Sequence, residues 1–119
     1  MILAVLDDLM FTSKIKSAAT HLGVTLVFAR SADAALGEMR KSAPALVIFD
    51  LNNPRTNPPA ILSAMKADAA LAGIPTLGFV SHVDTATIDA ARDAGIGEVI
   101  SRSAFTMHLA DILARDQRA

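Results

Sequence analysis

The sequence predicts a single α/β domain over residues 1–119, a doubly wound (βα)5 fold whose five parallel strands lie in the order 2-1-3-4-5. Two observations predict this class. Five short apolar runs recur along the chain, and a segment with helical periodicity follows each of them. The runs are continuously apolar rather than alternating, which is typical of parallel strands covered by helices on both faces. Right-handed crossovers then place helices on both sides of the sheet.

The elements follow in a regular order. The runs expected to form strands are 2–6, 24–29, 45–49, 76–80 and 97–101. The helices that follow them carry apolar faces that include Phe11, Ile15, Ala18 and Leu22; Leu36 and Met39; Ile61, Leu62 and Met65; Ile88 and Ala91; and Phe105, Leu109, Ile112 and Leu113. The residues expected to cap helices are Ser31 or Asp33, Asp84 and Ser103 at the amino ends, and Gly23 and Gly95 at the carboxyl ends.

Composition excludes several classes of function. Hydrophobic residues make up 52% of the chain and the formal net charge is −1, which excludes disorder as the main state and disfavours general nucleic-acid binding. Cysteine is absent, so disulfides, thiolate nucleophiles and cysteine-based zinc sites are excluded. No apolar run approaches the ~20 residues of a membrane span, and no secretory signal is recognisable. A cytoplasmic domain without nucleic-acid or membrane partners is therefore expected.

Acidic residues end two strands that are neighbours in the predicted sheet. Asp7 and Asp8 follow the first strand, and Asp50 follows the third. Sites in such sheets form beyond the carboxyl ends of the strands, near the point where strand order reverses, so the three carboxylates are expected to crowd one small area. Mg²⁺ suits this arrangement, because it takes a few carboxylates and keeps several waters. Alternatively, Asp8 only caps a helix and Asp50 only starts a turn.

Four short motifs occur in a fixed order along the chain. They are Leu6-Asp7-Asp8 with Ile15 seven positions later, the strand and loop 46–52, Ile74-Pro75, and Ala94-Gly95 seven residues before Arg102. Together, and over nearly the full length, they resemble a response-regulator receiver domain of the CheY-like family, which has a flavodoxin-like fold. The ordered set is more specific than an Asp-Asp pair alone.

The resemblance implies a signalling chemistry rather than an enzyme. It implies that Asp50 is the phosphoacceptor, the nucleophile that takes a phosphoryl group from a histidine kinase or a phosphotransfer protein. It also implies that Asp7, Asp8, Asp50 and the main-chain carbonyl of Asn52 hold Mg²⁺. A carboxylate that attacks an anionic phosphoryl group needs cations to offset the charge build-up. The output would be binding of a downstream protein, and the apolar surface of the last two helices would suit a homodimer.

Three positions depart from the pattern of the family. The family has Thr or Ser thirty residues after the acceptor, and this count leads to Val80; the adjacent Ser81 should face away unless a bulge or local twist intervenes. The lysine after the fifth strand is Arg102, which keeps the charge but not the geometry. The aromatic switch position is Val99. Since these residues normally sense and relay the phosphoryl group, we expect acceptor chemistry with a weakened relay.

Two other interpretations stay open. The three departures favour a pseudo-receiver, a protein-interaction module that works without phosphorylation. An aspartate-nucleophile phosphohydrolase would use Asp7 as its nucleophile, but such enzymes leave one residue between two acids, whereas Asp7 and Asp8 are contiguous. Arg55, in the loop after the third strand, could reach an anion, but a solvated charge is expected.

Overall fold

A computed structural model describes residues 1–81 and 84–117 and confirms the predicted fold class. Five strands form one parallel sheet in the order β2-β1-β3-β4-β5. The strands are β1 (Ile2–Val5), β2 (Leu26–Ala29), β3 (Leu46–Asp50), β4 (Thr76–Val80) and β5 (Glu98–Ser101). The helices are α1 (Leu9–Leu22), α2 (Ala32–Ser42), α3 (Pro58–Ala67), α4 (Thr85–Asp93), α5 (Arg102–Met107), α6 (Leu109–Leu113) and the 3₁₀ turn η1 (Ala114–Gln117). Within these described ranges, no helix has both the length and the hydropathy to cross a membrane.

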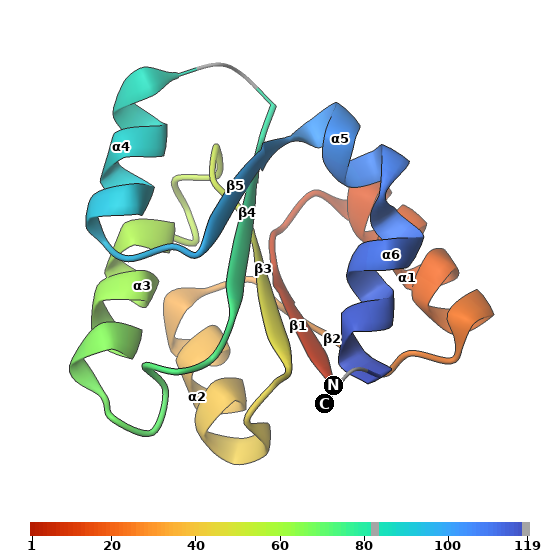
Figure 1. Cartoon of the computed structure of the whole chain (residues 1–119), viewed down its shortest axis with the longest axis horizontal. Coiled ribbons are helices and arrows are strands. Elements are labelled where there is room, and N and C mark those ends of the chain that lie inside the picture. Colours follow the sequence, from red (N-terminus) through yellow and green to blue (C-terminus); the bar gives the residue numbers. More distant parts are fainter. Residues whose placement is uncertain (82–83, 118–119) are drawn as a thin grey trace.

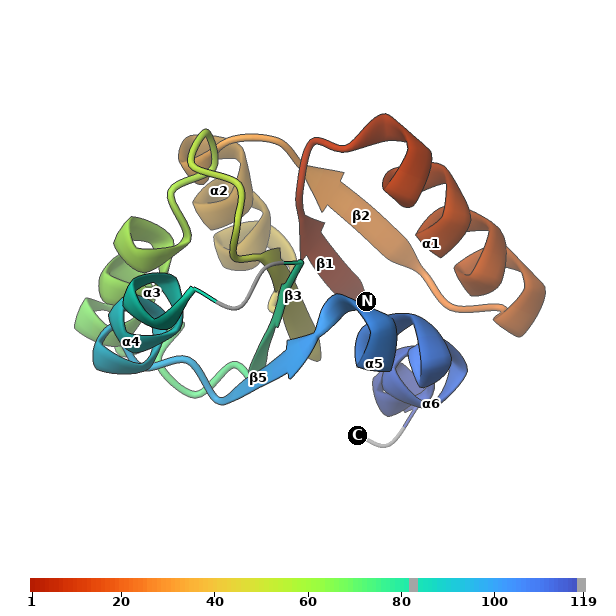
Figure 2. The ribbon, with the colours of Figure 1, turned by 90° about the horizontal axis from the view of Figure 1, so that it is seen from above.

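Helices cover both faces of the sheet, so the molecule has two hydrophobic cores (Figure 1; Figure 2). The first core lies between the sheet and α1, α5 and α6, and it contains the rings of Phe11, Phe79 and Phe105. The second core lies between the sheet and α2, α3 and α4. Side chains alternate between the two cores along each strand, as Ile48 and Phe49 do on β3. This alternation decides on which side of the sheet the side chain at the end of a strand lies.

Local polar contacts set several helix ends. The hydroxyl of Ser31, rather than the carboxylate of Asp33, caps α2 by accepting a hydrogen bond from the N–H of Ala34. Gly23 ends α1 in the left-handed conformation, with φ of 71°, as expected. The next residue, Val24, still belongs to this turn, because its N–H donates to the carbonyl of Ala19. Strand β2 therefore begins later than the apolar run suggests.

The last helix differs from its prediction in two ways. Ser101, not Ser103, caps α5, because Ser101 has the extended backbone that a cap requires and its hydroxyl accepts from the N–H of Ala104. Ser103 already lies inside the helix, and its hydroxyl contacts that of Ser101 at 3.2 Å. The expected single helix is also divided, since His108, with φ of −104° and ψ of 17°, separates α5 from α6.

Candidate functional site

Strands β1 and β3 bring the three predicted acids to the same edge of the sheet. The two strands are paired directly, with Val5 opposite Phe49. Asp50 is therefore one residue beyond this pair, and Asp7 and Asp8 leave β1 at the same level. All three side chains are partly exposed at this carboxyl edge. This is the edge at which open α/β sheets form their sites.

The fold raises the pKa of Asp50. Burial is the main cause and raises the pKa of Asp50, and the charges of Asp8 and Asp7 act in the same direction. The N–H of Asn52, which donates to Asp50 Oδ1 at 3.1 Å, and the guanidinium of Arg102 oppose this rise in the pKa. An ionised Asp50 is thus a carboxylate that additional positive charge would stabilise.

Asp7 is held by the loop that follows β3. The buried side chain of Asn53 donates from Nδ2 to Asp7 Oδ1, and Nη1 of Arg55 lies 3.4 Å from Asp7 Oδ2. The N–H of Arg55 donates in turn to Asn53 Oδ1 at 3.0 Å, which orients the amide. Sequence reasoning missed Asn53, and it treated Arg55 as a solvated charge. The side chain of Arg55 is indeed 83% exposed, yet it reaches Asp7.

Asp8 has two partners, one on each carboxylate oxygen. Oδ1 caps α1 by accepting from the N–H of Phe11 at 3.0 Å, so the capping alternative describes part of its role. Oδ2 lies 3.5 Å from Nη2 of Arg102. The guanidinium carbon of Arg102 also lies 4.1 Å from the centroid of the Phe11 ring, within the range of a cation–π contact. Arg102 is therefore held between a carboxylate and an aromatic face.

Metal binding is possible for this donor set by its chemistry, but the side chains are not arranged around one ion. Among the described residues, no group of three or more His, Asp or Glu side chains is placed so that it could hold a metal. Asp7, Asp8 and Asp50 each have a partner of their own instead. The three carboxylates thus share one edge of the sheet, where Asp7 and Asp8 also act on the pKa of Asp50. Carboxylate oxygens suit Mg²⁺, and the guanidinium groups beside Asp7 and Asp8 would have to share them or move away.

Val80 and Ser81, at the end of β4, have different surroundings. The side chain of Val80 is buried in the second core, together with Leu51 and Ala91. Asp50 pairs with Phe79, whose ring is in the first core, so Asp50 faces the first core's side of the sheet. Ser81 follows the last residue of β4 and is exposed. The N–H of Ser81 donates to Asn52 Oδ1 at 2.5 Å, which ties the end of β4 to the loop after Asp50.

Val99, the expected aromatic position, packs against the second core from β5. It is paired with Gly78 on β4. A Cβ added to Gly78 would lie 2.6 Å from Cδ1 of Leu51 and 2.7 Å from Cδ1 of Ile96, so these side chains occupy the space that the glycine leaves. Val99 has no ring that could turn between an inward and an outward position.

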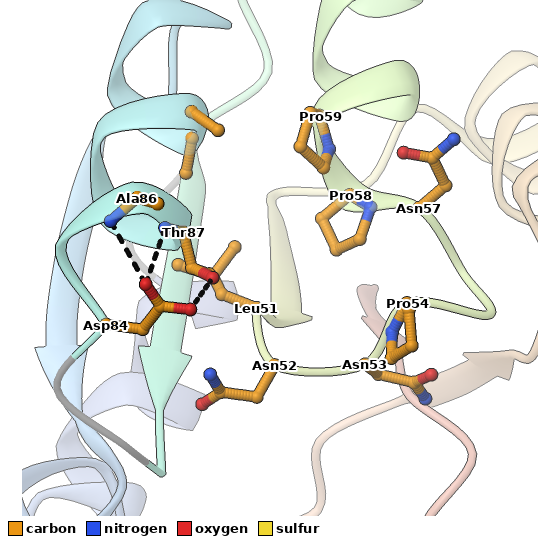
Figure 3. A pocket seen from close by; sticks show the side chains of 12 residues that line it. Leu51, Asn52, Asn53, Pro54, Asn57, Pro58, Pro59, Asp84, Ala86 and Thr87 are labelled. Carbon is orange, nitrogen blue, oxygen red and sulfur yellow. Dashed lines mark hydrogen bonds between the residues drawn. The ribbon is translucent and has the colours of Figure 1, made fainter.

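A cavity of about 580 Å³ lies beside the same loop but does not include the acids. Figure 3 shows it between the amino end of α3, with Pro58 and Pro59, and the first turns of α4. Asp84 stands at its edge and accepts hydrogen bonds from the Thr87 hydroxyl and from the N–H groups of Thr87 and Ala86, which lower the pKa of Asp84. The loop after β3 thus lines the cavity, but Asp7, Asp8 and Asp50 do not.

Comparison with known proteins identifies relatives by fold only. No family model matches the chain, and no curated protein matches it. Among solved structures, the chemotaxis protein CheY4 of Vibrio cholerae is 17% identical with a TM-score of 0.81, over 97% of this chain and 96% of that one. A phosphorylated cyanobacterial phytochrome response regulator, RcpA, is 24% identical with a TM-score of 0.74, over 94% and 86%. The Mn²⁺-bound response regulator Rcp1 is 17% identical with a TM-score of 0.77, over 95% and 91%. The chain therefore has the CheY-like receiver fold.

Proposed function

We propose that this chain, folded as a CheY-like receiver, is a single-domain receiver of a two-component or phosphorelay system that accepts a phosphoryl group on Asp50. The observation that carries the proposal is the position of Asp50. It ends β3 in the middle of the sheet, it is partly exposed, and Asp7 and Asp8 end the neighbouring strand at the same edge. A lone acid at a strand end has many explanations, whereas this trio in this fold favours phosphoryl transfer.

The transfer breaks the N–P bond of a phosphohistidine on a histidine kinase or phosphotransfer protein and forms an O–P bond at the Asp50 carboxylate. Mg²⁺ held by Asp7, Asp8, Asp50 and the main-chain carbonyl of Asn52 would offset the negative charge that builds up on the phosphoryl oxygens. Arg102 adds a fixed positive charge beside Asp50. We assign the hydroxyl role to Ser81 rather than Val80, because Val80 has no hydroxyl and its side chain is buried in the second core.

Two exposed apolar side chains support docking of the phosphodonor protein next to the acceptor. Leu9 and Met10 open α1 directly after Asp8 and are 64% and 86% exposed. Large apolar side chains in such positions are typical of protein-binding surfaces when they form part of a patch. A donor protein seated on them would stand over the carboxyl edge of the sheet.

Val99 supports a weakened relay after phosphorylation. It offers no ring to reorient, and Val80 offers no hydroxyl, so a phosphoryl group has fewer ways to favour one conformation over another. We therefore expect phosphorylation with a small structural response. The alternative is a pseudo-receiver, which the separate partners of the three acids favour.

Intact-mass measurement tests the proposal. The chain is incubated with Mg²⁺ and acetyl phosphate, beside Asp50→Asn and the control Asp89→Asn, which changes an exposed acid on α4. We expect one phosphoryl adduct on the wild type and on Asp89→Asn, and none on Asp50→Asn. No adduct on any variant, combined with no measurable Mg²⁺ affinity, would establish the pseudo-receiver instead. Multiple-turnover phosphate release from small esters would point to a phosphohydrolase.

The weakened relay has its own measurement. Beryllofluoride mimics a phosphoryl group on a carboxylate, and amide NMR shifts report where the backbone responds. We expect changes confined to the carboxyl edge of the sheet. Large changes that extend through α4 and α5 would contradict a weakened relay.

A further inference from the structure

We infer that Arg102 is a resident cation of the acid site, which Phe11 positions against Asp8 and which competes with a divalent ion for that carboxylate. The inference rests on the proposed function, because it concerns the metal that phosphoryl transfer requires. It concerns one atom in particular, Asp8 Oδ2, which faces Nη2 of Arg102 at 3.5 Å. A divalent ion that uses this oxygen has to share it with the guanidinium or displace the guanidinium.

The pair is more than a chance surface contact, because the guanidinium has a second partner. Its central carbon lies 4.1 Å from the centroid of the Phe11 ring, and the side chain of Arg102 is only 39% exposed. A planar guanidinium stacks on an aromatic face and pairs with a carboxylate at the same time, a combination that an ammonium does not match. The arginine at this position is thus explained by what surrounds it.

The Phe11 ring that contacts Arg102 is itself held by two other aromatic rings. The Phe11 ring packs edge-on against Phe79, with ring centroids 5.2 Å apart, and lies 5.8 Å from Phe105. Phe79 and Phe105 stack on each other at 4.8 Å. Phe11 also donates its N–H to Asp8, so the amino end of α1 supplies the ring and its cap residue supplies the carboxylate. Arg102 therefore meets two partners that are held in place before any ligand arrives.

The net charge of the site indicates how this arrangement affects its affinity for a divalent ion. Three carboxylates and two guanidinium groups, those of Arg55 and Arg102, leave a net charge of −1 instead of −3. Arg55 contributes little of this reduction, because its side chain is 83% exposed and solvent screens it. Arg102 is thus the main internal competitor. The structure predicts that the affinity for divalent ions is limited by Arg102 and rises when Arg102 is removed.

Titration of the full chain with Mn²⁺, with the free ion measured by electron paramagnetic resonance, tests this directly. The variants are Arg102→Ala and Phe11→Leu. The control is Arg40→Ala, which removes the same charge from a pair with Asp68 outside the site. We expect Arg102→Ala to bind Mn²⁺ about two to five times more tightly, the range of a partly exposed charge pair. Phe11→Leu keeps the charge but loses the ring, so its affinity should rise by a smaller factor, while Arg40→Ala should match the wild type.

The outcomes separate this inference from the proposed function. If the wild type binds Mn²⁺ and Arg102→Ala binds equally or more weakly, the competition is disproved while the receiver function stands. If no variant binds Mn²⁺, the metal site of the proposed function is disproved, and the inference with it. Far-UV circular dichroism identifies any variant that fails to fold, and Arg102→Gln then replaces Arg102→Ala, because the neutral amide removes the charge and keeps much of the side chain.

Discussion

Val80→Thr is the substitution that counting residues suggests as a repair, and the structure predicts that it fails. Val80 lies thirty residues after Asp50, where receivers carry a hydroxyl, yet its side chain is only 8% exposed and points into the second core beside Leu51 and Ala91. Thr has the shape of Val with a hydroxyl in place of one methyl group. The hydroxyl would therefore enter an apolar environment on the face opposite Asp50.

The cost follows from this burial. A buried hydroxyl without a hydrogen-bond partner destabilises a protein by about 1–3 kcal/mol. Because Val80 is the last residue of β4 and keeps slight access to solvent, we expect the lower part of that range, about 1–2 kcal/mol of unfolding free energy. For a slope of about 1–2 kcal/mol per molar urea, the unfolding midpoint would fall by about 1 M. The yield of phosphoryl adduct on Asp50 should not rise.

Urea unfolding followed by far-UV circular dichroism measures the effect, since the chain has no Trp or Tyr for fluorescence. Ser81→Thr is the matched control, because it adds a methyl group at the adjacent exposed residue and should change stability by less than about 0.5 kcal/mol. Unchanged stability of Val80→Thr, together with a higher or longer-lived phosphoryl adduct, would refute the assignment of Val80 to the second core.

Three further predictions concern the sheet and its edge. Burial raises the pKa of Asp50 in the folded state above its ordinary value of 3.8. Protonation of Asp50 therefore stabilises the folded state fully below pH 3.8, and this stabilisation is lost as pH rises through the higher pKa. Asp50→Asn should thus unfold at higher urea than the wild type at neutral pH, and the two should converge on acidification; a less stable variant at neutral pH would contradict this. Thr76→Val leaves the N–H of Gly97 without the hydroxyl that accepts from it at 2.8 Å, so thermal unfolding should show a loss of about 1 kcal/mol that Thr76→Ser avoids. Gly78→Ala places a Cβ 2.6 Å from Leu51 Cδ1 and should cost about 1–3 kcal/mol in urea unfolding, and an unchanged midpoint would show that Leu51 moves freely.

The fold could be predicted from the sequence because its signals are local. Each apolar run forms a strand, and the strand order is the expected one. The ends of elements were less predictable where two residues competed for one role, as Ser101 and Ser103 did at the start of α5. There the backbone conformation, which the sequence does not specify, decided the cap.

The edge of the sheet was predictable in its residues but not in their contacts. Asp7, Asp8 and Asp50 follow from the strand ends, whereas the face of Val80 depends on the register between β3 and β4, which counting along the chain does not determine. The stacking of Arg102 on Phe11 joins residues from opposite ends of the chain. Asn53 gave a weak signal, an amide in the loop after β3, and only its burial reveals its contact with Asp7.

The contact between Arg102 and Phe11 also couples two helices mechanically. Arg102 is the first residue of α5, and Phe11 lies in the first turn of α1, so the guanidinium joins the beginnings of these two helices. A cation that displaced Arg102 from Asp8 would weaken this link between the two helix ends. A partner protein that binds both helix ends would therefore respond to cation binding at the acids without contacting them.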